Sequence, residues 1–200
     1  PYTTLFRSTF SSTTVSMADY HVEEYVREIN LAAIRLAREL ADEYTAKNPD
    51  KPRFVAGSVG PTNKTCSMSP DVNNPAFRAL SYDELTASYQ QQMEAMLEGG
   101  VDAILIETIF DTLNAKAAIF AAGQAMKVTG IEVPVMLSVT VSDIGGRTLS
   151  GQTLEAFLAS VQHANIFSVG LNCSFGARQL KPFLEQLASR APYYISAYPN

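Results

Sequence analysis

The sequence has no tryptophan, two histidines and two cysteines among 200 residues. Cys66 and Cys173 lie far apart along the chain, which excludes the closely spaced Cys and His ligands of a self-contained zinc site. Two isolated thiols are also typical of a reducing compartment rather than of a disulfide framework. We therefore expect a cytoplasmic protein with free cysteines.

Runs of one kind of residue are also lacking. Fifteen basic residues are scattered among twenty acidic ones, for a net charge of −5, and the absence of a basic run argues against a nucleic-acid surface. No apolar run approaches the ~18 residues that a membrane span needs, and no signal-peptide pattern opens the sequence. A hydrophobic content of 46% is instead typical of a globular protein with a sizeable core.

Residues 1–8 read PYTTLFRS and show neither amphipathic periodicity nor a capping signal. They look like the translation of a sequencing-library adapter, so we expect a non-native leader that adds no element to the fold. We expect native sequence from Thr9 to Asn200, as a partial barrel domain from a longer protein.

Apolar segments alternate with helical patterns along the rest of the chain. Strands are expected at 54–59, 102–108, 133–139, 167–171 and 193–197. Helices are expected at 19–47, 81–97, 112–127, 153–163 and 178–189. Such alternation indicates an α/β fold, a parallel sheet with helices outside.

Two architectures fit that pattern, a (β/α)8 barrel and an open doubly wound sheet. No Gly-x-Gly-x-x-Gly follows any expected strand, which counts against a dinucleotide-binding fold. A complete barrel needs about 250 residues, so we favour an incomplete (β/α)8 TIM barrel.

Polar residues stand at or just after the carboxyl ends of the expected strands, and in a parallel sheet these ends share one rim. They are Ser58, Glu107, Thr140, Asn172 with Cys173, and Asn200. Glu107 ends an apolar strand, where an unpaired carboxylate is costly. It could accept a hydrogen bond from a substrate ammonium or hydroxyl, or it could pair with Arg147 or a helix N-terminus.

The cysteines and histidines leave further alternatives open. Cys173 stands where a buried strand meets a loop, a place for chemistry in α/β folds, but most free cysteines only pack as small hydrophobes. Cys66 lies in a long irregular segment, 62–80, with no second metal ligand near it in the sequence. We expect no function for Cys66, for His21 in the first turn of the long helix, or for His163 at a helix end.

Five segments carry a resemblance to a known family. They are GSVGPTNKT (57–65), SMSPDVNNPAFR (67–78), ETIFDTLNAKA (107–117), GRTLSGQT (146–153) and GLNC (170–173). These segments resemble the amino-terminal homocysteine-binding domain of the cobalamin-dependent methionine synthases. The resemblance runs from Thr9 to Asn200 and implies a (β/α)8 barrel that lacks its first and eighth strands here.

The resemblance also implies chemistry. Cys173 matches one of three cysteines that hold a zinc ion, and the other two would lie beyond residue 200. Homocysteine binds the zinc through its sulfur and accepts a methyl group from methylcobalamin to give methionine. The cobalamin and methyltetrahydrofolate sites belong to other modules of such enzymes, outside this chain.

The same resemblance assigns substrate roles to two more residues. Glu107 matches an acid that holds the homocysteine ammonium, and Asn172 matches a partner beside the zinc cysteine, which we expect to bind substrate. A cobalamin-independent homocysteine S-methyltransferase and a non-catalytic barrel module remain as alternatives. We expect the 200 residues alone to be inactive.

Overall fold

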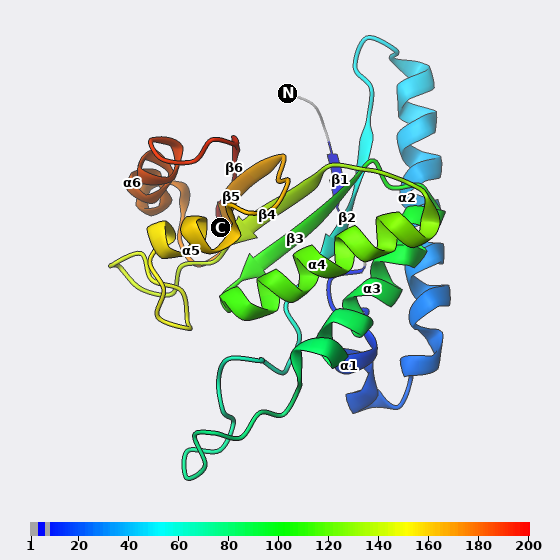
Figure 1. Cartoon of the computed structure of the whole chain (residues 1–200). Coiled ribbons are helices and arrows are strands. Elements are labelled where there is room, and N and C mark those ends of the chain that lie inside the picture. The colour runs from blue at the N-terminus through cyan, green and yellow to red at the C-terminus, as the bar shows by residue number, and fades with distance from the viewer. Residues whose placement is uncertain (1–3, 7–8) are drawn as a thin grey trace.

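The structure, a computed structural model, describes residues 4–6 and 9–200. Its strands form one parallel sheet, in the order β1-β2-β3-β4-β5-β6 (Figure 1). They are β1 (Thr4–Phe6), β2 (Phe54–Val59), β3 (Ala103–Ile109), β4 (Val135–Val139), β5 (Ser168–Asn172) and β6 (Tyr194–Tyr198). Each strand lies beside its sequence neighbour, without the order reversal of a doubly wound sheet. The prediction of an incomplete (β/α)8 barrel is therefore confirmed.

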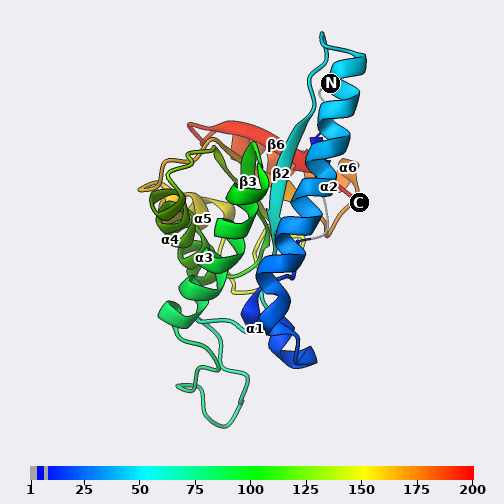
Figure 2. The same ribbon diagram turned by 90° about the vertical axis from the view of Figure 1, so that its right-hand side faces the viewer.

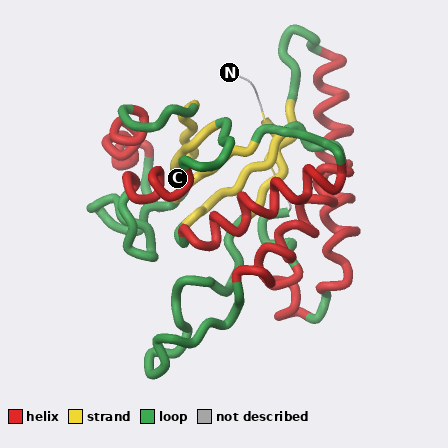
Figure 3. The backbone as a smooth tube through the Cα atoms, in the orientation of Figure 1, coloured by secondary structure: helices red, strands yellow, loops and turns green. Residues whose placement is uncertain are grey.

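Helices cover one face of this sheet (Figures 2 and 3). They are α1 (Thr14–Met17), α2 (Val26–Lys47), α3 (Tyr82–Gly99), α4 (Thr112–Thr129), α5 (Leu154–Val161) and α6 (Ala177–Ala188), with short 3-10 helices at Ala18–Tyr20 and Glu23–Tyr25. In residues 4–6 and 9–200 no helix is both long and apolar enough to cross a membrane.

Successive side chains of a strand point to opposite faces of the sheet, and here the two faces differ in polarity. Ile104, Ile106, Leu137 and Leu171 belong to the core cluster between the sheet and the helices. The side chains between them in sequence point to the opposite face, the inside of the incomplete barrel. That inner face carries polar groups that the helices do not cover: Ser58, Glu107, Ser138 and Asn172.

The amino-terminal region differs from the sequence prediction in two ways. Helix α2 begins at Val26 rather than near residue 19, because His21 has a left-handed backbone (φ 56°) that ends the first 3-10 helix. His21 is exposed, but it precedes the long helix. Thr4–Phe6 forms a strand beside Phe54–Ala56, although no element was expected in residues 1–8. An unpaired strand edge such as that of β2 readily accepts a further strand. That residues 1–8 are non-native stays a prediction.

Gly170 on β5 sits where no larger residue fits. A methyl group there would collide with the hydroxyl and the backbone carbonyl of Ser196 on β6. We expect Gly170→Ala to destabilise the fold by about 1–3 kcal/mol or more, as overpacking does, measured by chemical denaturation.

Gly123 in the middle of α4 provides the matched control. A methyl group there meets nothing within 4 Å, so Gly123→Ala should stabilise the helix by roughly 0.5–1 kcal/mol. Equal effects of the two substitutions would contradict the close β5–β6 approach.

Candidate active site

Glu107 lies at the carboxyl end of β3, half-buried on the inner face. Its Oε1 accepts a hydrogen bond of 2.5 Å from Ser58 Oγ on β2. The structural alternatives for Glu107 are not formed. Arg147 donates to the Gly151 carbonyl instead, at 3.0 Å, and Asp111 caps the N-terminus of α4. The carboxylate therefore has a hydroxyl partner and no cation from the groups that the sequence suggested.

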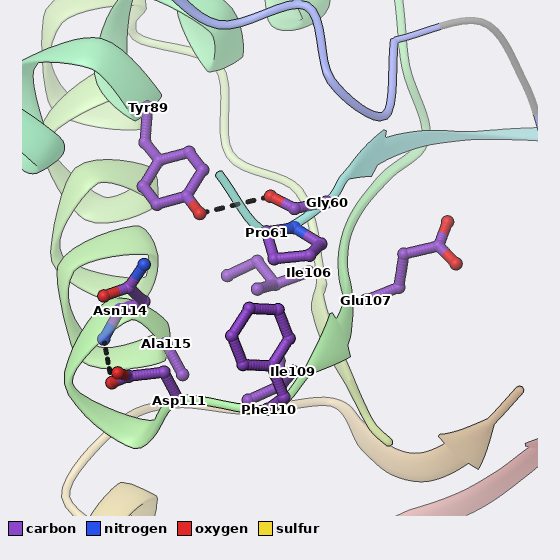
Figure 4. Close-up of a pocket in the computed structure, with 10 residues that line it drawn as sticks. All are labelled: Gly60, Pro61, Tyr89, Ile106, Glu107, Ile109, Phe110, Asp111, Asn114 and Ala115. Carbon is purple, nitrogen blue, oxygen red and sulfur yellow. Dashed lines mark hydrogen bonds between the residues drawn. The ribbon is translucent and has the colours of Figure 1, made fainter. Parts of the chain in front are cut away.

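Figure 4 shows which way the Glu107 carboxylate points. A pocket between β3 and the helices is lined by Tyr89 and Asn114 among others, and the Tyr89 hydroxyl donates to the Gly60 carbonyl at 3.1 Å. The Glu107 carboxylate points away from Tyr89 and Asn114, to the other side of the strand. Glu107 is thus among the residues that line this pocket, but its carboxylate belongs to the inner face.

Asn172 ends β5 and joins three strands with one side chain. Its Oδ1 accepts hydrogen bonds from Thr108 N on β3 (3.1 Å) and from Ser138 Oγ on β4 (2.7 Å). Its Nδ2 donates to Thr108 Oγ1 (2.8 Å) and to Cys173 Sγ (3.1 Å). The side chain is buried, so the ends of β3, β4 and β5 are linked through one amide.

Backbone strain is concentrated at the same place. Thr108, Cys173 and Ser174 each have φ 58°, in the left-handed region. Such a φ is uncommon for a residue other than glycine and is an outlier for a β-branched threonine. Strained backbone of this kind clusters at functional sites, where the surroundings hold it in place.

Cys173 carries a free thiol and is half-buried. Its backbone N–H donates to the Tyr198 carbonyl of β6 (3.1 Å), and its own carbonyl accepts from Phe175 N (2.7 Å). The cysteine is therefore fixed through its backbone on both sides, with its sulfur next to the Asn172 amide.

Two more polar residues predicted at strand ends, Thr140 and Asn200, lie close to the segment 172–175. Thr140 Oγ1 donates to the Asn172 carbonyl (3.2 Å), and Asn200 N donates to the Phe175 carbonyl (3.2 Å). Sequence reasoning missed Thr108 and Ser138. The inward alternation of β4 could have indicated Ser138, whereas nothing local marks the role of Thr108.

Cys66 is a different kind of thiol. It is buried in the core cluster, and its backbone N–H donates to Asn114 Oδ1 at 2.9 Å. Burial raises the pKa of the Cys66 thiol to about 11, with a smaller contribution from the negative charge of Asp111. Cys66 is thus part of the packing that anchors the loop to α4.

Iodoacetamide is expected to alkylate Cys173 at least tenfold faster than Cys66 at pH 8. At that pH a thiol with a pKa of about 11 is ionised in only about one molecule in a thousand, and the thiolate is the reactive form. Raising the pH to 10 should increase the Cys66 rate nearly a hundredfold, because its thiolate fraction rises by that factor. Peptide mass spectrometry on the zinc-free folded protein would measure both rates. Equal rates at pH 8 would contradict the buried environment of Cys66.

A metal site is not complete within the part of the chain that the structure describes. No group of three His, Cys, Asp or Glu side chains there could hold a metal ion. Cys173 fits a zinc ligand by its chemistry, since it is a half-buried free thiol whose sulfur receives an N–H from Asn172. Outer hydrogen bonds of this kind commonly orient metal ligands. Residues 4–6 and 9–200 thus offer one candidate thiolate for zinc.

The profile of the family described as homocysteine S-methyltransferase matches residues 5–200. Two crystal structures of the homocysteine methyltransferase MmuM from Escherichia coli are similar in fold. The oxidised form has a TM-score of 0.77 at 20% identity, over 98% of this chain and 65% of that one. The apo form has a TM-score of 0.69 at 23% identity, over 89% of this chain and 61% of that one. This chain therefore spans less than two thirds of the length of those relatives.

Proposed function

Because the chain belongs to the homocysteine S-methyltransferase family, we propose that it is the homocysteine- and zinc-binding part of a cobalamin-dependent methionine synthase. The observation that carries the proposal is the position of Cys173. Cys173 is half-buried and directly follows β5, and its sulfur is linked through Asn172 to Thr108 of β3, the residue after Glu107. The long segments that resemble those synthases support this choice within the family.

In this proposal Cys173 would hold the zinc together with two thiolates from outside these 200 residues. A zinc ion with three protein thiolates leaves its fourth position to the substrate sulfur and favours the thiolate, the nucleophilic form. The substrate thiolate would accept the methyl group of methylcobalamin, which would give methionine and leave the bonding electron pair on the demethylated cobalamin. The 200 residues alone would be inactive, because one thiolate cannot replace three.

Glu107 would bind the homocysteine ammonium. Ser58 holds its Oε1, which leaves Oε2 to accept a hydrogen bond from the substrate. A charge-assisted bond between carboxylate and ammonium is stronger than a neutral one, so it would fix the amino-acid end of homocysteine. Asn172 stands beside Cys173 and would act on the substrate either directly or through the residues that it holds.

A second candidate is a cobalamin-independent homocysteine methyltransferase with a small methyl donor. The fold similarity to MmuM, whose name is homocysteine methyltransferase, keeps this candidate open. Both candidates share the zinc, Cys173 and Glu107 and differ in the donor.

The test is to supply the full-length protein that contains this chain, loaded with zinc, with homocysteine and one donor at a time. Methionine from methylcobalamin, and none from a small methylsulfonium compound, is the expected result. Methionine from the sulfonium donor without cobalamin would favour the second candidate. Methionine from neither donor would contradict both.

A further inference from the structure

The hydrogen-bonding capacity of the Asn172 amide is fully used inside the protein. A primary amide accepts two hydrogen bonds through its oxygen and donates two through its nitrogen. Oδ1 accepts from Thr108 N and Ser138 Oγ, and Nδ2 donates to Thr108 Oγ1 and Cys173 Sγ. The side chain is 2% exposed. No donor or acceptor of Asn172 is left to recognise a substrate.

The orientation of this amide follows from its neighbours. The backbone N–H of Thr108 can only donate, so the group that faces it at 3.1 Å must be the amide oxygen. The nitrogen then faces the Thr108 hydroxyl and the Cys173 sulfur. The strained backbone of Thr108 therefore decides that an N–H, and not a carbonyl oxygen, points at the sulfur.

Ser138 secures the same orientation from the next strand. Its hydroxyl donates to Asn172 Oδ1 at 2.7 Å and lies in the buried inner face of β4. The amide is thus held from β3 and β4 while its own residue belongs to β5. A rotation of its side chain would break four hydrogen bonds at once, and each buried polar group left unpaired is costly.

We propose that Asn172 is a positioning residue that sets the direction of the Cys173 sulfur for metal binding, and that Thr108 and Ser138 act through it. The inference rests on the proposed function, since the metal in question is the zinc of that site. An N–H directed at a metal-bound sulfur fixes the sulfur and favours its negative charge. Asn172 then influences homocysteine only through the cysteine beside it.

Asn172→Ala in the full-length protein tests this, with Asn114→Ala as the matched control. Asn114 is also a buried asparagine that accepts a backbone N–H, from Cys66, and donates to the Lys64 carbonyl, but it does not touch Cys173. We expect Asn172→Ala to bind zinc about 10- to 100-fold more weakly, as loss of an outer-shell partner does. Asn114→Ala should lower the melting temperature and leave zinc affinity within about twofold.

Zinc affinity would be measured by competition with a chelator, and the thiolate-to-metal absorption of the cobalt-substituted protein would be compared. Wild-type zinc affinity and an unchanged cobalt spectrum in Asn172→Ala, with a raised KM for homocysteine, would overturn the inference in favour of direct substrate contact. If Asn172→Ala does not fold, the zinc affinity of Ser138→Ala tests the inference instead. This substitution removes one hydrogen bond to the Asn172 amide and leaves the amide in place. A weaker zinc affinity in Ser138→Ala supports the inference, and an unchanged one overturns it. A wild-type protein that binds no zinc would overturn the proposed function, and this inference with it.

Discussion

Replacing Cys173 with serine in the full-length protein is expected to abolish zinc retention and methyl transfer while the fold survives. Serine keeps the shape of the side chain and can still accept a hydrogen bond from Asn172, which now reaches the sulfur at 3.1 Å. It cannot supply the thiolate that zinc requires from this position. The loss in zinc affinity should exceed the 10- to 100-fold change that is typical of outer-shell partners.

Cys66→Ala is the control for that experiment, because it removes the other thiol of the chain. Cys66 is buried and bonded through its backbone to Asn114, so its loss should lower stability and leave zinc binding unchanged. Alkylation gives a second readout, since zinc should protect Cys173 from iodoacetamide in the wild-type protein. If zinc does not slow alkylation of Cys173, the residue is not a zinc ligand.

Glu107→Gln is expected to weaken homocysteine binding by about 30-fold to several thousand-fold. Truncating one partner of a buried, hydrogen-bonded charge pair costs about 2–5 kcal/mol, and 1.4 kcal/mol is a factor of ten. Glutamine has the size of glutamate and can still accept the hydrogen bond that Ser58 donates at 2.5 Å. The change therefore removes the charge with little effect on packing.

The measurement is calorimetric titration of the zinc-loaded, full-length protein. A thiol acid without an amino group serves as control ligand, because it has no ammonium for Glu107 to bind. Its affinity should be the same for the wild type and for Glu107→Gln, and zinc content should not change. Equal losses for homocysteine and for the control thiol would show that Glu107 shapes the site and does not recognise the ammonium.

The elements that the sequence predicted best have local signals. Strand β2 was expected at 54–59 and spans Phe54–Val59, because an apolar run meets the turn residues Gly60 and Pro61. Helix α3 starts after Ser81, whose side chain and that of Glu84 form the expected capping box. These signals depend on neighbours within a few residues, which is why the sequence alone was enough.

The predicted start of α2, near residue 19, was wrong because no local signal marks its true start at Val26. The apolar periodicity runs on through residues 19–25, but contacts with distant segments decide the backbone there. Asp19 accepts a hydrogen bond from Asn63, 44 residues further along the chain. Helical periodicity is a weak guide where tertiary contacts hold another conformation.

The candidate site also combines features that have a local sequence signal with features that depend on distant contacts. The apolar runs before Glu107 and Asn172 predicted that both residues lie near the carboxyl ends of parallel strands. The hydrogen bonds of Asn172 could not be predicted in this way, because they join residues 64 and 34 positions apart. The left-handed backbone of Thr108 has no signal of its own, since threonine is among the residues that least favour it.

The amide of Asn172 also has a consequence for the order of folding. Asn172 lies on β5 and its distant partners lie on β3 and β4, and two helices stand between these three strands in the sequence. Contacts between residues distant in sequence form late, because they need closure of long loops. The Asn172 amide is therefore held in its orientation toward the Cys173 sulfur only after β3, β4 and β5 have paired. In a chain whose strands have not yet paired, the amide beside Cys173 would not be held toward the sulfur. Metal capture at this residue would then report that three strands have reached their native register.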